Sequence, residues 1–359
     1  MLYGIVLAGG RGERFWPLSR AARPKQFLRL TSDRIMLEET ISRTLPLIPL
    51  DRVRIVTGES MANLVLQNIP SLKPAHLLTE PVGRNTCTAV GLAAVHVLAE
   101  DPDAILAVLS ADHLIRPAEK LLEIIACGAQ IAAEEKVLIT IGIAPTRAEV
   151  GYGYIRLGEK HRECSGAQIF QVSGFTEKPR PAIAKEYYFS GNYLWNSGMF
   201  IWSARDILDA IEQCQPDTSA LLKEYAKHIG LASEAEAREE LYREVPSVSI
   251  DVAVLERASN VLTIKADIIW DDVGDWNALS RYRERNADNN VTVGKSLLRE
   301  SYETTVYNES EGLVACLGVS DLVVVRSGDI TLVVHKTKAQ NVKSIIAELA
   351  KDEATKKYL

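Results

Sequence analysis

The segment YGIVLAGGRGERFWPLSRAARPKQ (residues 3–26) joins a short apolar run to a glycine-rich loop. The first six residues read as a buried strand, and three glycines follow within residues 9–12. A loop at the carboxyl end of a strand is where open α/β sheets bind ligands, and glycines let backbone N–H groups approach an anion. The same loop carries Arg11, Arg14 and Lys25. We therefore expect a phosphorylated ligand here.

The spacing of this loop excludes two common phosphate-binding motifs. A P-loop places its lysine directly after a glycine, whereas Lys25 lies thirteen residues after Gly12. The dinucleotide fingerprint requires a third glycine where this chain has Phe15. The alternation of strands and helices at the start of the chain would suit a nicotinamide oxidoreductase, but this loop does not.

The first 145 residues alternate between strand-like and helix-like patterns. Short β-branched runs occur at YGIVLA, RVRIVTG, AILAVLSAD and VLITIGI. Helix-length segments lie near residues 36–47, 60–69, 86–100 and 117–135. This alternation predicts a parallel sheet covered on both faces. Glycine-bearing extended segments follow between residues 149 and 276, and Ser203 is expected to cap a helix together with Asp206.

A polar cluster at residues 286–290 predicts a boundary between a catalytic domain, residues 1–285, and a β-rich domain, residues 286–359. Beyond it, apolar residues recur every nine positions, which suggests a small repetitive β unit; they are Val306, Ala315, Val324 and Val333. A closing helix is expected to carry an apolar stripe of Val342, Ile345, Ile346 and Leu349. We expect this domain to support assembly and to contain no chemistry.

The composition excludes several classes of protein. With 359 residues, 41 Lys+Arg, 47 Asp+Glu and a net charge of −6, the chain is an ordinary globular protein without the basic character of a nucleic-acid binder. No apolar run is long enough to span a membrane, and no basic leader precedes the first strand. The five cysteines lack metal or redox spacing, so we expect small buried side chains and a cytoplasmic protein.

Carboxylates form a second candidate feature. Asp112 ends a very apolar strand within SADH, and the turn WDDVGDW (residues 270–276) carries three more carboxylates. Mg²⁺ is commonly bound by one or two carboxylates together with phosphate oxygens and water. Together with an anion-binding loop, these carboxylates predict a metal pair.

The ordered motifs together resemble the mannose-1-phosphate guanylyltransferases (GDP-mannose pyrophosphorylases) of the sugar-nucleotidyltransferase superfamily. The matching segments, which span residues 7–276, are LAGGRGERFWPLS, PKQF, EPVGRNT, SADH, GYGYI, FTEKP, WNSGMF, SIDVAVLE and WDDVGDW. The chain departs from the family pattern at Cys87-Thr88 and at Asp275, where the family usually has Ala-Pro and Ser. The resemblance implies an α/β fold with a Rossmann-like, glycosyltransferase-A-like mixed sheet and flanking helices. It also implies a C-terminal unit resembling a left-handed β-helix, and a homodimer.

The resemblance also implies site residues. Those expected to act in catalysis are Arg14, Lys25, Asp112 and Asp272. Those expected to bind the nucleotide are Leu7, Ala8, Gly9, Gly10, Arg11, Gly12, Glu80, Pro81, Arg84, Asn85, Thr86 and Asp112. Those expected to bind the sugar phosphate are Gly153, Glu177, Lys178, Asn196 and Asp251. Asp112 and Asp272 are the expected ligands of Mg²⁺, with Mn²⁺ as the alternative metal.

The implied reaction transfers GMP from GTP to mannose 1-phosphate and gives GDP-mannose and pyrophosphate. Because the attacking phosphate monoester is largely a dianion at neutral pH, no general base is required. Two alternatives remain open at this point. One is a thymidylyl- or uridylyltransferase acting on another hexose 1-phosphate, and the other is a non-catalytic nucleotide sensor. Retention of Lys25, Asp112, Lys178 and Asp272 argues against the sensor.

Overall fold

The computed structural model describes residues 1–10 and 12–359, so the predicted ligand-binding residue Arg11 lies outside the described residues. By packing, the chain divides into two compact units, each built from separated segments. The sheet unit comprises Met1–Gly9, Thr40–Ala111 and Ile115–Trp270. The β-helix unit comprises Gly10–Glu39, Asp112–Leu114 and Asp271–Leu359. This division does not coincide with the domain boundary expected after residue 285, which stays a prediction.

The sheet unit is built on a nine-stranded mixed sheet of order β3-β2-β1-β4-β9-β6-β10-β8-β7. Its strands are β1 (Leu2–Leu7), β2 (Val53–Gly58), β3 (Leu77–Glu80), β4 (Ile105–Ser110), β6 (Leu138–Ile143), β7 (Tyr154–Cys164), β8 (Ala167–Thr176), β9 (Tyr193–Ser203) and β10 (Val261–Ala266). Strands β2, β1 and β4 are parallel, as the sequence predicts, and β3, which the sequence analysis did not predict, is parallel to β2. The predicted strand β6 runs in the same direction as β4, but the expectation of an all-parallel sheet is wrong because β9 inserts between β4 and β6 and runs antiparallel to both.

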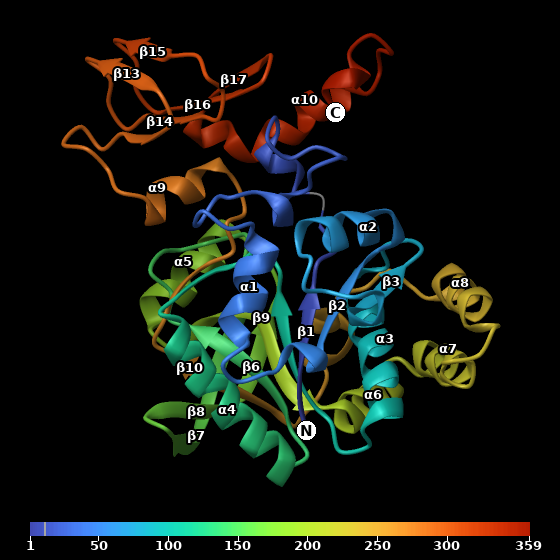
Figure 1. The fold of residues 1–359 in the computed structure, drawn as a ribbon. Coiled ribbons are helices and arrows are strands. Elements are labelled where there is room, and N and C mark those ends of the chain that lie inside the picture. Colours follow the sequence, from blue (N-terminus) through green and yellow to red (C-terminus); the bar gives the residue numbers. More distant parts are fainter. Residues whose placement is uncertain (11) are drawn as a thin grey trace. The chain divides into compact units, whose positions relative to one another are not determined.

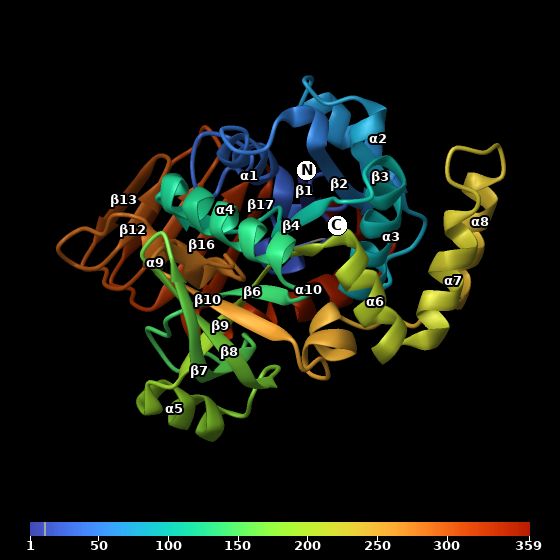
Figure 2. The same cartoon turned by 90° about the horizontal axis from the view of Figure 1, so that it is seen from below.

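Helices cover both faces of this sheet (Figures 1 and 2). They are α1 (Met36–Thr44, which crosses the division), α2 (Glu59–Asn68), α3 (Asn85–Glu100), α4 (Ala118–Glu134), α5 (Pro181–Ser190) and α6 (Ala204–Cys214). Helices α7 (Pro216–Ala226) and α8 (Glu234–Glu244) lie farther out, with α7 against α3 and α6 and α8 against α7. On β9, Phe200 and Trp202 lie in the core that contains α3 and α6. Ile201, which points to the opposite face, lies against α4 at Gly128.

One local prediction for the sheet unit, the helix cap at Ser203, is tested directly. The Ser203 hydroxyl accepts a hydrogen bond from Asp206 N at 2.9 Å and donates to the Asp206 carboxylate at 2.6 Å. The predicted cap of α6 is therefore confirmed, with the acidic side chain bound to the hydroxyl.

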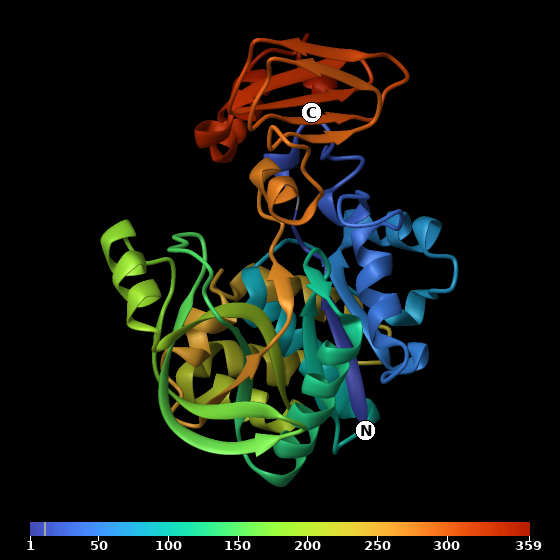
Figure 3. The same ribbon diagram turned by 90° about the vertical axis from the view of Figure 1, so that its left-hand side faces the viewer.

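The β-helix unit contains short strands stacked in parallel coils, visible in Figure 3. Its strands are β12 (Val291–Val293), β13 (Ser296–Arg299), β14 (Thr305–Asn308), β15 (Val314–Leu317), β16 (Leu322–Ser327) and β17 (Ile330–His335). It also contains α9 (Leu279–Tyr282) and α10 (Val342–Leu349), whereas the short strands β5 (Leu114–Arg116) and β11 (Ile269–Asp271) cross the division. Strands β12, β14 and β16 form one parallel ladder, and β13 and β15 form another.

The nine-residue recurrence places Val306 and Val324 on one ladder and Ala315 on the other, whereas Val333 lies on β17, which pairs antiparallel with β16. Val306 on β14 pairs with Val324 on β16, and both are buried. Ala315 on β15 is exposed, and Val333 on β17 is 59% exposed. The four recurring positions therefore lie on four different strands and differ in burial.

In the core of the β-helix unit, side chains of the coils pack against side chains near the start of the first segment, Gly10–Glu39. The ring of Trp276 is fully buried, with its centroid 5.1 Å from that of Phe15 and 5.5 Å from that of Tyr307. Trp276 Nε1 donates to the carbonyl of Trp16 at 3.2 Å. Val342 of α10 is buried in the same core, and Ile346 and Leu349 pack against it, as predicted. The fourth residue of the predicted stripe, Ile345, is 36% exposed, so the prediction is wrong at that position.

The cysteines meet the expectation only in part. Cys127 of α4 and Cys164 at the end of β7 form a disulfide. A sequence separation of 37 residues gives no sign that the two ends meet. The prediction of small buried side chains is confirmed for Cys87 and Cys127 and is wrong for Cys164, Cys214 and Cys316, which are only partly buried. Among the described residues, no helix combines the length and apolar character needed to cross a membrane. The cytoplasmic location stays a prediction.

We predict that Tyr307→Ala destabilises the protein by about 3–5 kcal/mol, because it removes a buried ring that packs on Trp276. Tyr307→Phe keeps the ring and is expected to cost far less. Urea denaturation followed by tryptophan fluorescence measures both variants. Equal free energies of unfolding for the two variants would contradict the packing role of this ring.

Candidate active site

The glycine-rich loop is shaped by a close approach between Gly12 and Lys25. Gly12 has a left-handed backbone (φ 63°), and a Cβ at this position would lie 2.1 Å from Lys25 Cβ. Only glycine satisfies both conditions without a shift of the neighbouring backbone. At Gly10, in contrast, a Cβ would meet no atom within 4 Å.

Lys25 joins three segments of the β-helix unit. Its side chain is buried, and Nζ donates to Asp112 Oδ2 at 2.6 Å and to the carbonyl of Asp272 at 2.8 Å. Burial alone would raise the pKa of Asp112, but the charges of Lys25 and His113, with the Lys25 hydrogen bond, hold this pKa below its ordinary value. Asp112 is therefore ionised at neutral pH.

The carboxylates of residues 270–276 have three different surroundings. Asp271 pairs with the Arg281 guanidinium and accepts a hydrogen bond from Val273 N at 2.8 Å. Asp275 accepts a hydrogen bond from Asn277 N at 2.8 Å and caps the short 3₁₀ helix Trp276–Ala278. Because serine can make the same cap, the departure from the family pattern at Asp275 adds no pocket ligand.

Asp272 is the carboxylate of this turn that lines a cavity. Its Oδ1 accepts from Gly274 N at 3.1 Å, and a Cβ on Gly274 would lie 2.6 Å from Oδ2, so a side chain at residue 274 would displace this carboxylate. The cavity measures about 510 Å³ and lies within the β-helix unit. Its lining residues are Gly10, Gly12, Glu13, Arg14, Lys25, Asp112, His113, Asp272, Gly274 and Lys343.

This lining brings together all four residues predicted to act in catalysis, and it adds four that the predicted site lacks, namely Glu13, His113, Gly274 and Lys343. His113 lines the cavity beside Asp112. Lys343 of α10 also lines it, although it belongs to the domain that is expected to contain no chemistry. The apolar stripe of α10 predicts which face is buried, but nothing in the sequence indicates what that face packs against.

The cavity offers a donor set that suits a divalent metal. Asp112 and Asp272 supply two carboxylates in one cavity, and Mg²⁺ characteristically uses one or two carboxylates and completes its shell with substrate phosphates and water. Within the part of the chain that the structure describes, no group of three or more His, Cys, Asp or Glu side chains forms a full protein cage. The donors therefore fit a metal that arrives with a phosphorylated ligand.

The residues predicted to contact the guanosine lie in the sheet unit, and several already have protein partners. Glu80 ends β3, is buried and accepts a hydrogen bond from Tyr242 Oη at 3.0 Å; burial raises its pKa, and this hydrogen bond opposes the rise. Its Oε2 lies 3.8 Å from the position of a Cβ on Gly9, so these two predicted residues are neighbours. Arg84 donates to the carbonyls of Tyr242 and Arg243 at the end of α8.

The other residues predicted to contact the guanosine also lie in the sheet unit. Thr86 Oγ1 accepts from Ile250 N at 2.9 Å, and Asn85 has a positive φ of 66° at the start of α3. Leu7 and Ala8 end β1 and continue its hydrogen bonding, with Ala8 N donating to the carbonyl of Val56. Pro81 follows β3 directly. Arg84 and Thr86 thus position α8 and residues 248–250.

All five residues predicted to bind the sugar phosphate form one cluster in the sheet unit. Asn196 Nδ2 donates to Asp251 Oδ1 at 2.7 Å, and Asn196 N donates to the Gly153 carbonyl at 2.8 Å. Lys178 Nζ donates to Glu177 Oε1 at 2.6 Å. A Cβ on Gly153 would lie 2.7 Å from Glu177 Oε2, so Gly153 and the end of the Glu177 side chain are neighbours.

The electrostatics of this cluster centre on Asp251. Burial raises its pKa to about 6, the charge of Glu177 adds to the rise, and Asn196 and Lys178 oppose it. Lys178 remains 64% exposed. An accessible cation beside buried carboxylate and amide groups can bind a phosphate and orient the hydroxyl groups of a sugar.

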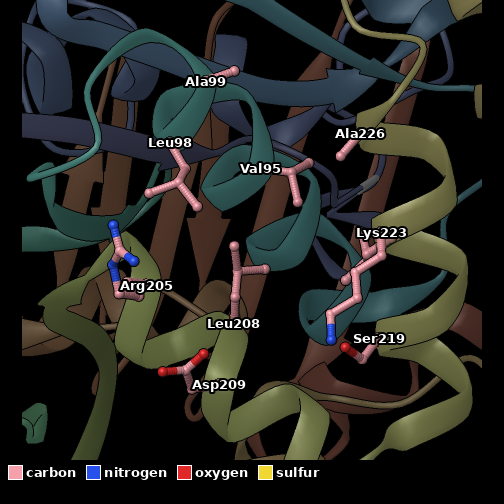
Figure 4. A pocket seen from close by; sticks show the side chains of 10 residues that line it. Val95, Leu98, Ala99, Arg205, Leu208, Asp209, Ser219, Lys223 and Ala226 are labelled. Atoms are coloured by element: carbon pink, nitrogen blue, oxygen red, sulfur yellow. The ribbon is translucent and has the colours of Figure 1, made fainter.

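Another cavity in the sheet unit, of about 450 Å³, lies among α3, α6 and α7 (Figure 4). Its lining is mainly apolar, with Val95, Leu98, Leu208 and Leu222, and contains none of the predicted site residues. It does not share the chemistry of the phosphate-binding loop.

Comparisons with known proteins agree with this arrangement. A family model described as Nucleotidyl transferase matches residues 3–289, and one described as MannoseP isomerase/GMP-like beta-helix domain matches residues 294–349. The chain is 36% identical over 356 residues to a mannose-1-phosphate guanylyltransferase of Salmonella typhimurium, covering 98% of this chain and 74% of that protein. It is 35% identical to the alginate biosynthesis protein AlgA of Pseudomonas aeruginosa, covering 96% of this chain and 71% of that protein.

A solved structure from Thermus thermophilus, described as a mannose-1-phosphate geranyltransferase, is similar along nearly the whole chain. It is 37% identical, has a TM-score of 0.87, and the match covers 97% of this chain and 99% of that one. A structure described as a mannose-6-phosphate isomerase from Helicobacter pylori, 24% identical with a TM-score of 0.60, supports the fold alone. It covers 75% of this chain and 99% of that chain. The predicted mixed α/β fold with a β-helix unit is confirmed.

We predict that Gly12→Ala lowers the free energy of unfolding by more than about 1 kcal/mol, because a Cβ would collide with Lys25 on a backbone of positive φ. Gly10→Ala is the matched control, since its Cβ meets open space. Chemical denaturation compares the two. If Gly10→Ala were as destabilised as Gly12→Ala, the close approach to Lys25 would not explain the need for glycine.

We predict that the burial of Asp251 lowers the free energy of unfolding by an amount that depends on pH. Because its pKa rises from 3.8 to about 6 on folding, the ionised form is disfavoured in the folded protein, and the wild type loses stability as pH rises from about 4 to 6. Asp251→Asn removes this dependence. The free energy of unfolding of the variant, relative to that of the wild type, should therefore increase by up to about 3 kcal/mol as pH rises through that range. Melting temperatures at successive pH values test this, with Asp209→Asn as a control on α6. Parallel pH curves for wild type and Asp251→Asn would contradict it.

Proposed function

This chain belongs to the nucleotidyl transferase family, and from this premise we propose how its residues transfer GMP from GTP to α-D-mannose 1-phosphate. Its relatives are mannose-1-phosphate guanylyltransferases, and the residues of this chain suit the same reaction. The observation that carries the assignment of residues is the cavity in which Lys25 and Arg14 lie with Asp112, Asp272 and the glycine loop. Cations, carboxylates and the backbone N–H groups of a glycine loop together suit a metal-bound triphosphate.

The reaction is a displacement at phosphorus. A phosphate oxygen of mannose 1-phosphate attacks the α-phosphorus of GTP, and the bond from this phosphorus to the oxygen bridging to the β-phosphate breaks. Pyrophosphate leaves with the bonding electron pair, and GDP-mannose forms. Because the second pKa of a phosphate monoester lies near about 6, the attacking group is largely a dianion at neutral pH and needs no general base.

The chain's own residues lower the barrier by positioning and charge. Arg14 and Lys25 reduce the repulsion between two anionic substrates and stabilise the charge that develops on pyrophosphate. Arg14 lines the cavity, where its guanidinium can meet the phosphates of the ligand. Lys25 keeps Asp112 ionised.

We assign the metal to Asp112 and Asp272, with Mg²⁺ as the expected ion and Mn²⁺ as its alternative. When bound, such an ion polarises phosphoryl oxygens and neutralises their charge. In the sheet unit, we assign guanosine contacts to the region of Gly9 and Glu80, and sugar-phosphate contacts to Gly153, Glu177, Lys178, Asn196 and Asp251. The hydrogen bonds that already tie Asn196 to Asp251 support a preorganised sugar site.

A panel of GTP, ATP, UTP and dTTP with mannose 1-phosphate or glucose 1-phosphate tests the function directly. We expect pyrophosphate release to be fastest with GTP and mannose 1-phosphate. Faster release with UTP or dTTP and glucose 1-phosphate would move the chain to the alternative activities. No release with any pair, despite nucleotide binding, would indicate a nucleotide sensor.

We predict that Asp112→Asn and Asp272→Asn each lower kcat by about 100-fold or more, because a charged metal ligand is lost while side-chain size is kept. Asp275→Ser is the matched control, since serine can still cap the helix at Trp276. Turnover is measured across a range of Mg²⁺ concentrations. Near-normal kcat in both Asn variants, or an equal loss in Asp275→Ser, would refute the ligand assignment.

We also propose that the protein is a homodimer assembled through the β-helix unit. Leu297 on β13 and Leu317 on β15 are 48% and 72% exposed, and Val333 on β17 is similarly uncovered. Exposed apolar side chains on adjacent strands are typical of surfaces that pack against another chain. Light scattering tests this proposal, and a monomeric mass at micromolar concentration would exclude it.

A further inference from the structure

The geometry points to Lys343 as a ligand for the terminal phosphates of the nucleotide and for the pyrophosphate that leaves. Lys343 lies on α10 within the region matched by the β-helix family model, well beyond the nucleotidyl transferase match that ends at residue 289. It nevertheless lines the same cavity as Arg14 and Lys25. The inference rests on the proposed function, since it names a further residue of that binding site.

The packing of α10 fixes Lys343 in this place. Val342, the residue before it, is 1% exposed in the core that contains Phe15 and Trp16. Trp16 Nε1 also donates to the carbonyl of Tyr358, at 2.8 Å, beyond the end of α10. The helix is therefore held against the turn that directly follows the glycine loop. Lys343, on the adjacent helix position, extends to the cavity.

Lys343 has a weak protein partner that a phosphate can replace. Its Nζ lies 3.8 Å from Glu13 Oε2, and the two side chains are 56% and 38% exposed. An exposed pair at this distance contributes little to stability, whereas a phosphate offers several strong acceptor oxygens. Lys25, in contrast, is buried and bonded to both Asp112 and Asp272.

The charge of the cavity supports this role. Among the described lining residues, the cations are Arg14, Lys25 and Lys343 and the carboxylates are Glu13, Asp112 and Asp272, so these formal charges cancel. A cavity that accepts a triphosphate needs every one of these cations, even with a divalent metal bound. Removal of Lys343 would leave this set of side chains with a net negative charge.

The position of Glu13 indicates which phosphates Lys343 meets. Glu13 begins the 3₁₀ helix Glu13–Phe15, directly after Gly12 of the phosphate loop. The α-phosphate must stand near the metal ligands Asp112 and Asp272, where the attack takes place. Lys343 pairs with Glu13 on the loop side of the cavity. It is therefore placed to meet the β- and γ-phosphates.

Lys343→Ala tests this assignment by comparing GTP with GMP. We expect the variant to raise KM for GTP, and KM for pyrophosphate in the reverse reaction, by about tenfold or more. GMP binding, measured by calorimetry, and KM for mannose 1-phosphate should stay close to wild type. Lys343→Arg should recover most of the loss, and Lys351→Ala, an exposed lysine near the end of the chain, should have no effect.

Glu13→Gln separates phosphate binding from a structural ion pair. If Lys343 serves only to bind Glu13, Glu13→Gln should reproduce the effects of Lys343→Ala. If Lys343 binds phosphate, Glu13→Gln should maintain or strengthen GTP binding, because it removes a competing carboxylate. Unchanged KM values for GTP and pyrophosphate in Lys343→Ala, in a preparation whose wild type is active, would overturn the inference. An inactive wild type would instead refute the proposed function.

Discussion

The buried ammonium group of Lys25 is the interaction on which the arrangement of the cavity depends. Its two hydrogen bonds hold Asp112 and the backbone of Asp272, which belong to segments far apart in the chain. Its aliphatic stem occupies the space that a side chain at residue 12 would need, so the glycine loop and the ion pair require each other. A buried charge is tolerated only with such partners, and removal of the Asp112 carboxylate would leave it poorly compensated. The same attraction keeps Asp112 ionised and available to a metal.

Neighbouring carboxylates acquire different roles through small differences in their surroundings. Asp271 neutralises Arg281, Asp275 caps a helix, and Asp272 lines the cavity, although all three belong to one short turn. The positive φ of Val273 changes the direction of the chain between them. In the sheet unit, Asp251 is buried beside Asn196 and Glu177, and its pKa rises instead. Residue type alone therefore does not indicate which carboxylate binds a metal, which orients a sugar and which supports the fold.

The β-helix unit does more than its sequence indicates. Its coils pack through Tyr307 against Trp276, which in turn packs on Phe15 next to the phosphate-binding loop. The closing helix α10 packs on the same core and carries Lys343 to the cavity. The unit thus contributes to the proposed guanylyltransferase site from a part of the chain that repeats short strands and has no catalytic motif.

The sequence by itself determined the elements whose signals are local. Apolar runs predicted β1, β2, β4 and β6, the Ser203 cap predicted the start of α6, and the ordered motifs predicted the family and the residues that gather in the cavity and around Asp251. Tertiary structure alone decided the antiparallel insertion of β9, the disulfide between Cys127 and Cys164, the outward exposure of Ala315 and Val333, and the placement of Lys343. The physical reason is the range of the interactions. Hydrophobic periodicity and helix caps act between residues a few positions apart, whereas strand order, cross-links and the lining of a cavity depend on which distant surfaces bury each other.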